Sequence, residues 1–130
     1  MKTLIVEDDF VNRLVLQKRL EEYGEVHIAV NGKEAIDAVR RMLEAGSKYD
    51  LICLDILLPE MDGQEVLREI RKAEADVGFQ VGRGSKIVMT TALKDSENVM
   101  TAFRHEADGY LVKPIETDQL QKQLAEIGLM

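Results

Sequence analysis

The chain has 130 residues, 45% of them hydrophobic and 32% charged, which predicts one domain over residues 1–130 with a full hydrophobic core. Its 24 acidic and 17 basic residues give a net charge of −7, which argues against broad binding to nucleic acid or to anionic membranes. A single cysteine excludes an internal disulfide, and no signal peptide or membrane span is visible, so we expect a cytoplasmic protein.

Short apolar runs rich in β-branched residues predict five strands. They lie at residues 3–6, 26–30, 51–54, 86–91 and 110–112. The run at 51–54 has no polar face, so we expect this strand to be buried on both sides of a sheet. Asp55 follows it directly, and an ionised carboxylate at that point requires water, a cation or a metal.

Apolar residues at helical spacing follow each predicted strand. We expect helices at about 11–23, from Asn31 to Gly46, from Asp62 to about Ala75, after Ser96 or Asp95, and after a capping Thr117. The first carries a wide apolar stripe made of Leu14, Val15, Leu16, Leu20 and Tyr23. Asn31 and Asp62 each precede a glutamate at the third helical position, a capping-box pattern. The glycine-rich segment 76–85 predicts a loop.

Strands that alternate with helices predict an α/β fold with a parallel sheet covered on both faces. Five units suit an open, doubly wound, flavodoxin-like sheet, whereas a closed barrel needs eight. In the common strand order 2-1-3-4-5, the first and third strands are neighbours. Ligands bind such sheets at the carboxyl ends of the strands, where the strand order reverses.

Chemically active side chains follow several of these strand ends. They are Glu7, Asp8 and Asp9 after the first strand, Asp55 after the third, Thr90 or Thr91 at the fourth, and Lys113 after the fifth. Carboxylates from two neighbouring strands would repel one another unless a cation lies among them. Oxygen ligands of this kind suit Mg²⁺, which binds one or two carboxylates together with water and phosphate.

A carboxylate, a hydroxyl and an ammonium beside a divalent cation suit phosphoryl transfer. A carboxylate can act as a nucleophile and form an acyl phosphate. The metal on one side and Lys113 on the other would then neutralise the charge on the phosphoryl oxygens.

At this point the chain resembles a response-regulator receiver domain of the chemotaxis type, from two-component signalling, over essentially its whole length. Four blocks carry the resemblance: Ile5-Val6-Glu7-Asp8-Asp9, Asp55 through Asp62-Gly63, Thr91-Ala92, and Tyr110-Leu111-Val112-Lys113-Pro114. Each block is weak alone, but all four stand in order on the expected strands.

The resemblance implies a metal and phosphoacceptor site. Asp55 would be the phosphoacceptor and a metal ligand, and Asp8 would be the main Mg²⁺ carboxylate. Glu7 would act through a bound water, and Leu57 would offer its backbone carbonyl to the metal.

The resemblance also implies a switch. Thr91 is preferred to Thr90 as the phosphoryl-binding hydroxyl because the family has a small residue next, here Ala92, although strand periodicity does not choose between them. The Lys113 side chain would bind the phosphoryl group, and the Lys113–Pro114 peptide would be cis. Tyr110 would be the aromatic whose ring turns inward as Thr91 moves.

The chain departs from the family in two ways. The 76–85 loop is longer than in compact members. Leu57 and Leu93 are apolar at variable positions that govern access of the hydrolytic water, so we expect slow self-dephosphorylation.

The expected function is a switch rather than a turnover enzyme. A histidine kinase or phosphotransfer protein would phosphorylate Asp55, and a downstream protein would read the face formed by the fourth helix, fifth strand and last helix. The length leaves no room for an output domain, so we expect a stand-alone receiver or an excised fragment.

Two alternatives stay open. One is a Mg²⁺-dependent phosphatase or phosphotransferase with an aspartyl-phosphate intermediate, although Leu57 stands where haloacid-dehalogenase-type enzymes have a second aspartate. The other is a degenerate receiver that only binds protein. Taken singly, the acidic triplet could be a solvated turn, Lys113 a surface lysine and Tyr110 a core aromatic.

Overall fold

The structure, a computed structural model, describes residues 1–92 and 96–130, without the side chains of residues 96–99. Within these residues five parallel strands form one sheet in the order β2-β1-β3-β4-β5, which confirms the predicted fold class and strand order. The strands are β1 Thr3–Val6, β2 Val26–Ala29, β3 Leu51–Asp55, β4 Lys86–Thr91 and β5 Gly109–Val112.

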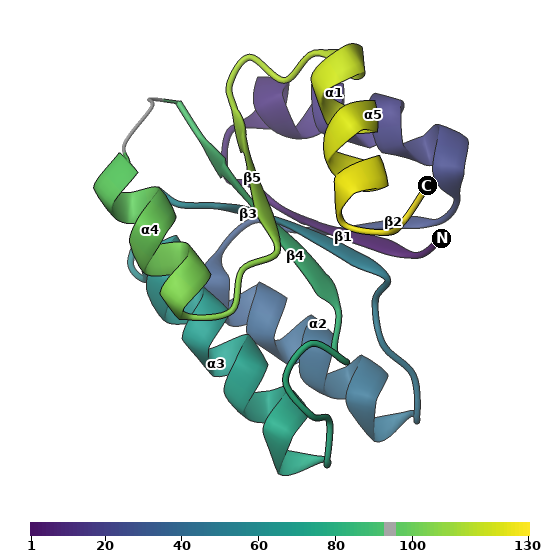
Figure 1. Ribbon diagram of the computed structural model, residues 1–130, viewed down its shortest axis with the longest axis vertical. Helices are drawn as coiled ribbons and strands as arrows, with labels where there is room; N and C mark the ends of the chain where they lie inside the picture. The colour runs from purple at the N-terminus through teal and green to yellow at the C-terminus, as the bar shows by residue number, and fades with distance from the viewer. Residues whose placement is uncertain (93–95) are drawn as a thin grey trace.

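Helices cover both faces of the sheet. The helices are α1 Phe10–Leu20, α2 Gly32–Glu44, α3 Gly63–Asp76, α4 Ser96–Arg104 and α5 Thr117–Glu126, with a short 3₁₀ turn at Glu21–Tyr23. Figure 1 shows α1 and α5 on one face and α2, α3 and α4 on the other. Over the described residues, no helix is both long and apolar enough to cross a bilayer.

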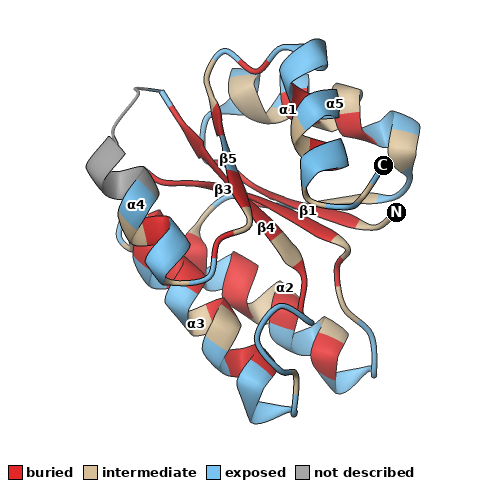
Figure 2. Ribbon diagram, in the orientation of Figure 1, coloured by how far each residue is buried: buried red, intermediate tan, exposed pale blue. Residues whose placement is uncertain are grey.

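Alternation along the strands divides the core in two. On β3, Ile52 and Leu54 pack toward α2 and α3, whereas Leu51 and Cys53 pack toward α1 and α5. All four side chains are almost completely buried, as expected for a central strand with both faces covered. Figure 2 shows buried residues continuing along the strands and the inner faces of the helices.

The helix caps agree in part with the sequence. Asn31 accepts a hydrogen bond from the Glu34 amide, and Asp62 accepts from the amides of Gln64 and Glu65, so both predicted caps are confirmed. Thr117 was expected to cap the last helix. It is instead the first residue of α5, and its hydroxyl accepts a hydrogen bond from Arg19 of α1.

Two expectations about helices need adjustment. The apolar stripe of α1 is narrower than predicted, because Leu16 and Leu20 are buried while Leu14 and Val15 are exposed. Asp9 caps α1 by accepting from the Asn12 amide, so the helix begins at Phe10. Ser96 is the first residue of α4, whereas the predicted roles of Asp95 and Leu93 and the side chain of Val99 lie outside the described part.

Candidate functional site

The first, third and fifth strands bring charged residues to one edge of the sheet. β1 runs into Glu7 and Asp8, β3 ends on Asp55, and β5 is followed by Lys113. The β1 and β3 strands pair directly, so their carboxyl ends lie side by side. The Lys113 amide donates to the Thr91 carbonyl, which continues the ladder between β4 and β5 to the start of the site.

Lys113 lies between two buried carboxylates. Its Nζ is 2.5 Å from Glu7 Oε1 and 2.9 Å from Asp55 Oδ2. The side chains of Glu7 and Asp55 are only 1% and 6% exposed, and that of Lys113 is 13% exposed. A lysine that reaches inward to this extent is not a surface lysine, because two buried carboxylates hold its ammonium group.

The carboxylates outnumber the ammonium group, and this affects titration. Burial, together with a hydrogen bond to Asp55, raises the pKa of Glu7 to about 7, against the opposing effect of Lys113. Burial lowers the pKa of Lys113, but its bonds to Glu7 and Asp55 outweigh this and raise that pKa above its ordinary value. Glu7 therefore keeps its proton to a higher pH than an ordinary glutamate, and Lys113 stays charged.

The three acids are placed to share a cation. Glu7, Asp8 and Asp55 each offer an oxygen, and these oxygens lie within 4.8 Å of one another. Asp8 is exposed while the other two are buried, so the cluster opens to solvent on one side. An all-oxygen donor set that opens to water fits Mg²⁺, which retains several waters when bound. The Asp9 side chain caps α1 by accepting a hydrogen bond from the Asn12 amide.

The β3–α3 connection holds Asp55 from the other side. The Leu57 amide donates to Asp55 Oδ1 at 3.0 Å, and the Leu57 side chain is 69% exposed. Gly63 lies against the same backbone, because a Cβ at this position would approach the Asp55 carbonyl oxygen to 2.2 Å. The absence of a side chain at Gly63 therefore allows α3 to begin against the phosphoacceptor candidate.

The predicted switch residues lie on β4 and β5. Thr90 and Thr91 are both buried, and Thr90 is the residue paired with Asp55 in the strand register. Tyr110 is 38% exposed, so it is not a core aromatic. Its ring meets that of Phe103 of α4 edge to face, with 6.4 Å between ring centres. The Lys113–Pro114 peptide is cis, as the resemblance implies.

Arg13 is a neighbour of the site that sequence reasoning missed. Its Nη1 donates to the backbone carbonyls of Glu7 and Asp8, and its guanidinium lies over the Phe10 ring. These contacts restrain the β1–α1 connection that carries the acids. The spacing of α1 gave no signal for them, because an arginine on the half-exposed side of a helix normally points to solvent.

Comparison with known proteins gives a consistent result. A family model described as "Response regulator receiver domain" matches residues 3–125. The osmosensing histidine protein kinase SLN1 of Saccharomyces cerevisiae is 33% identical over 128 residues, 97% of this chain and 10% of that protein. The probable transcriptional regulator ycf27 of Cyanidium caldarium is 36% identical over 125 residues, 95% of this chain and 45% of that protein. The chain thus spans less than half the length of these relatives.

A solved structure is similar in both sequence and fold. The receiver domain of the histidine kinase CKI1 from Arabidopsis thaliana, complexed with Mg²⁺ and BeF₃⁻, has a TM-score of 0.83 and 33% identity to this chain. The alignment covers 97% of this chain and 88% of that one.

Proposed function

The chain belongs to the response regulator receiver domain family, and from that premise we propose that it is a switch that accepts a phosphoryl group on Asp55. The observation that carries the proposal is the contact of Lys113 with both Glu7 and Asp55, beside the exposed carboxylate of Asp8. The donor is a histidine kinase or a histidine phosphotransfer protein. The relatives SLN1 and CKI1 are histidine kinases by name.

In the proposed step, an Asp55 carboxylate oxygen attacks phosphorus and the phosphorus–nitrogen bond of a phosphohistidine breaks. The imidazole leaves with its electron pair, and an acyl phosphate remains on Asp55. Asp8 and Asp55, together with the Leu57 carbonyl and a water held by Glu7, would hold Mg²⁺, which would supply charge neutralisation at the phosphoryl oxygens. Burial and the Leu57 amide orient the nucleophile before the donor arrives.

Lys113 and Thr91 are the proposed phosphoryl-binding residues. Lys113 already touches Asp55 Oδ2, so a small displacement would move its ammonium from that oxygen to a phosphoryl oxygen. Thr91 would donate its hydroxyl from the end of β4. Tyr110 stands exposed, and it would turn inward as Thr91 moves, which changes the α4–β5–α5 face that a downstream protein reads. We place this protein in the cytoplasm.

The test is incubation of the protein with acetyl phosphate and Mg²⁺, followed by intact-mass measurement. We expect the mass of one phosphoryl group to be added to the wild type and nothing to Asp55→Asn. Asp9→Asn is the matched control, because asparagine also caps α1 and labelling should persist. Equal labelling of Asp55→Asn would reject the proposal. Continuous turnover of a phosphomonoester would support the enzyme alternative instead.

A further inference from the structure

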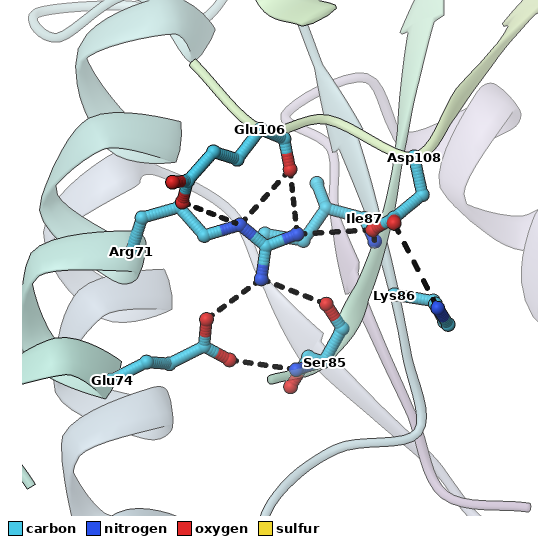
Figure 3. Close-up of polar contacts among 7 residues, drawn as sticks. All are labelled: Arg71, Glu74, Ser85, Lys86, Ile87, Glu106 and Asp108. Carbon is cyan, nitrogen blue, oxygen red and sulfur yellow. Dashed lines mark hydrogen bonds and ion pairs between the residues drawn. The ribbon is translucent and has the colours of Figure 1, made fainter. Parts of the chain in front are cut away.

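A second charged cluster lies at the opposite edge of the sheet, near the amino ends of β4 and β5. Its centre is Arg71 of α3, whose side chain is 13% exposed. The guanidinium makes five hydrogen bonds, one for each of its N–H groups, as Figure 3 shows. The receiver chemistry proposed above uses none of these contacts.

Three of the five bonds hold the end of α4 and the start of β5. Nε and Nη2 donate to the Glu106 carbonyl at 3.0 and 2.7 Å, and Nη2 also donates to Asp108 Oδ2 at 3.0 Å. Glu106, two residues after the end of α4, adopts a left-handed backbone with φ 75°. Asp108 Oδ2 in turn accepts the Ile87 amide at 2.8 Å, which ties this point to β4.

The other two bonds hold the loop before β4. Nη1 donates to Glu74 Oε1 at 2.7 Å and to the Ser85 carbonyl at 2.8 Å, and Glu74 Oε2 accepts the Ser85 amide. Gly84 packs directly against the Glu74 side chain, because a Cβ at Gly84 would come within 2.2 Å of the Glu74 carboxylate. Arg71 therefore joins α3, β4, α4 and β5 at one point.

The two ends of α4 are connected to the rest of the chain in different ways. Its first residue, Ser96, lies five positions beyond Thr91, the last residue of β4, so this end is close in sequence to the proposed switch residue. Its last turn is closed by three amides: those of His105, Glu106 and Ala107 donate to carbonyls within α4. Arg71 then holds the carbonyl that follows this turn.

We propose that Arg71 is a positioning residue that makes the carboxyl end of α4 a fixed point, so that a signal at Thr91 repositions α4 about that end. This inference rests on the proposed phosphoryl switch. With the far end fixed, displacement concentrates in the part of α4 that lies nearer the site and reaches the exposed side chain of Met100. We call these contacts of Arg71 the anchor. Without the anchor, the same change at Thr91 would move or fray the whole of α4 and would not reposition it about one end.

The experiment is amide hydrogen exchange with and without BeF₃⁻ and Mg²⁺, in wild type and Arg71→Gln. In the wild type, we expect BeF₃⁻ to change exchange at Met100 and Thr101 severalfold and to leave His105, Glu106 and Ala107 unchanged. In Arg71→Gln, these last three amides should exchange faster by on the order of a hundredfold even without BeF₃⁻. The BeF₃⁻ response at Met100 and Thr101 should fall by at least half.

Two further variants separate anchoring from general stability. Glu74→Gln keeps an acceptor for the Ser85 amide and leaves the Glu106 contacts in place, so the response of α4 should persist. Arg71→Lys keeps the charge but has too few N–H groups for five bonds. This variant should lose part of the BeF₃⁻ response at Met100 and Thr101. It replaces Arg71→Gln in the test if Arg71→Gln does not fold.

The outcomes distinguish the two proposals. If BeF₃⁻ has no effect on the wild type, the phosphoryl switch fails, and this inference fails with it. If BeF₃⁻ binds every variant and Arg71→Gln responds at Met100 and Thr101 as the wild type does, the switch stands and the anchor is rejected. The anchor is also rejected if the wild type responds equally at both ends of α4.

Discussion

Two charged clusters lie at opposite edges of the sheet, and each places a basic side chain between two carboxylates. At the carboxyl edge, Lys113 contacts Glu7 and Asp55 through a single ammonium nitrogen. At the amino edge, Arg71 hydrogen-bonds two carboxylates and two backbone carbonyls and also forms an ion pair with the Glu106 carboxylate. Both basic side chains are 13% exposed, so burial alone does not distinguish the clusters.

The difference lies in how completely each cluster is satisfied. Every N–H of Arg71 has an acceptor, and the Glu74 and Asp108 carboxylates that it hydrogen-bonds also accept backbone amides. At the other edge one ammonium group contacts two of three clustered acids, and burial raises the pKa of Glu7 to about 7. A charged cluster whose polar atoms all have partners stabilises the fold. A cluster with an excess of carboxylates is instead suited to bind a cation, and then a phosphoryl group.

Removal of the basic side chain at the carboxyl edge should have the largest effect on reactivity. We expect Lys113→Met to slow phosphorylation by acetyl phosphate roughly 100- to 1,000-fold, because one preorganised positive group no longer meets the phosphoryl oxygens. The measurement is the rate of mass labelling at saturating Mg²⁺. Lys122→Met, on α5, is a matched control that should label at the wild-type rate. A labelling rate within threefold of the wild type for Lys113→Met would contradict this role.

Removal of the Arg71 side chain at the amino edge should lower the stability of the fold and not its reactivity. Arg71→Gln leaves buried carboxylates and carbonyls without their partner, so we expect the free energy of unfolding in urea to fall by about 3 kcal/mol. Arg40→Gln is the matched control, since Arg40 lies 3.9 Å from Glu69 in an exposed pair, and its loss should cost less than about 0.5 kcal/mol. Equal losses for the two variants would show that the Arg71 cluster is no more than a surface ion pair.

Sequence reasoning anticipated the carboxyl edge far better than the amino edge. Parallel strands bring their ends together, so Glu7, Asp55 and Lys113 could be grouped once the strands and their order were predicted. The fold followed from the same apolar runs. Which of Thr90 and Thr91 serves the site could not be derived, because a shift of one residue in register reverses the faces of a strand.

The amino edge depends on loops whose paths no local pattern specifies. Within α3, Arg68 and Arg71 look alike as charged residues, yet Arg68 is exposed and Arg71 is nearly buried. One signal was present: Leu67, Ile70, Arg71 and Glu74 share the spacing of a single buried helix face. A polar pair on an apolar face predicts an internal ion pair, but the partners from β4 and β5 emerge only in three dimensions.

The raised pKa of Glu7 gives a smaller effect that depends on pH. Without metal, the folded protein holds a proton on Glu7 up to about pH 7, whereas the unfolded chain releases it near 4.5. The folded state therefore binds more protons between these values, and stability should fall as the pH rises from 4.5 to 7, by on the order of 1 kcal/mol. Urea unfolding at several pH values measures this slope.

Two comparisons identify Glu7 as the source of this pH dependence of stability. The contribution should disappear in Glu7→Gln and persist in Glu65→Gln, which alters an exposed carboxylate of α3. It should also shrink in the presence of Mg²⁺, because a cation favours the ionised carboxylate. A slope of the same size in Glu7→Gln would assign it to another group.

The smallest effect concerns the open side of the acidic cluster, which has no equivalent at the amino edge. Leu57 is 69% exposed beside Asp55 and has no polar atom in its side chain to orient an attacking water. We therefore expect Leu57→Asn to shorten the lifetime of the aspartyl phosphate roughly two- to tenfold, the worth of one hydrogen bond of about 0.5–1.5 kcal/mol. Leu57→Met should leave the lifetime unchanged. If purified wild-type protein with Mg²⁺ lost its phosphoryl group within seconds, apolar side chains at this rim could not be what protects the acyl phosphate.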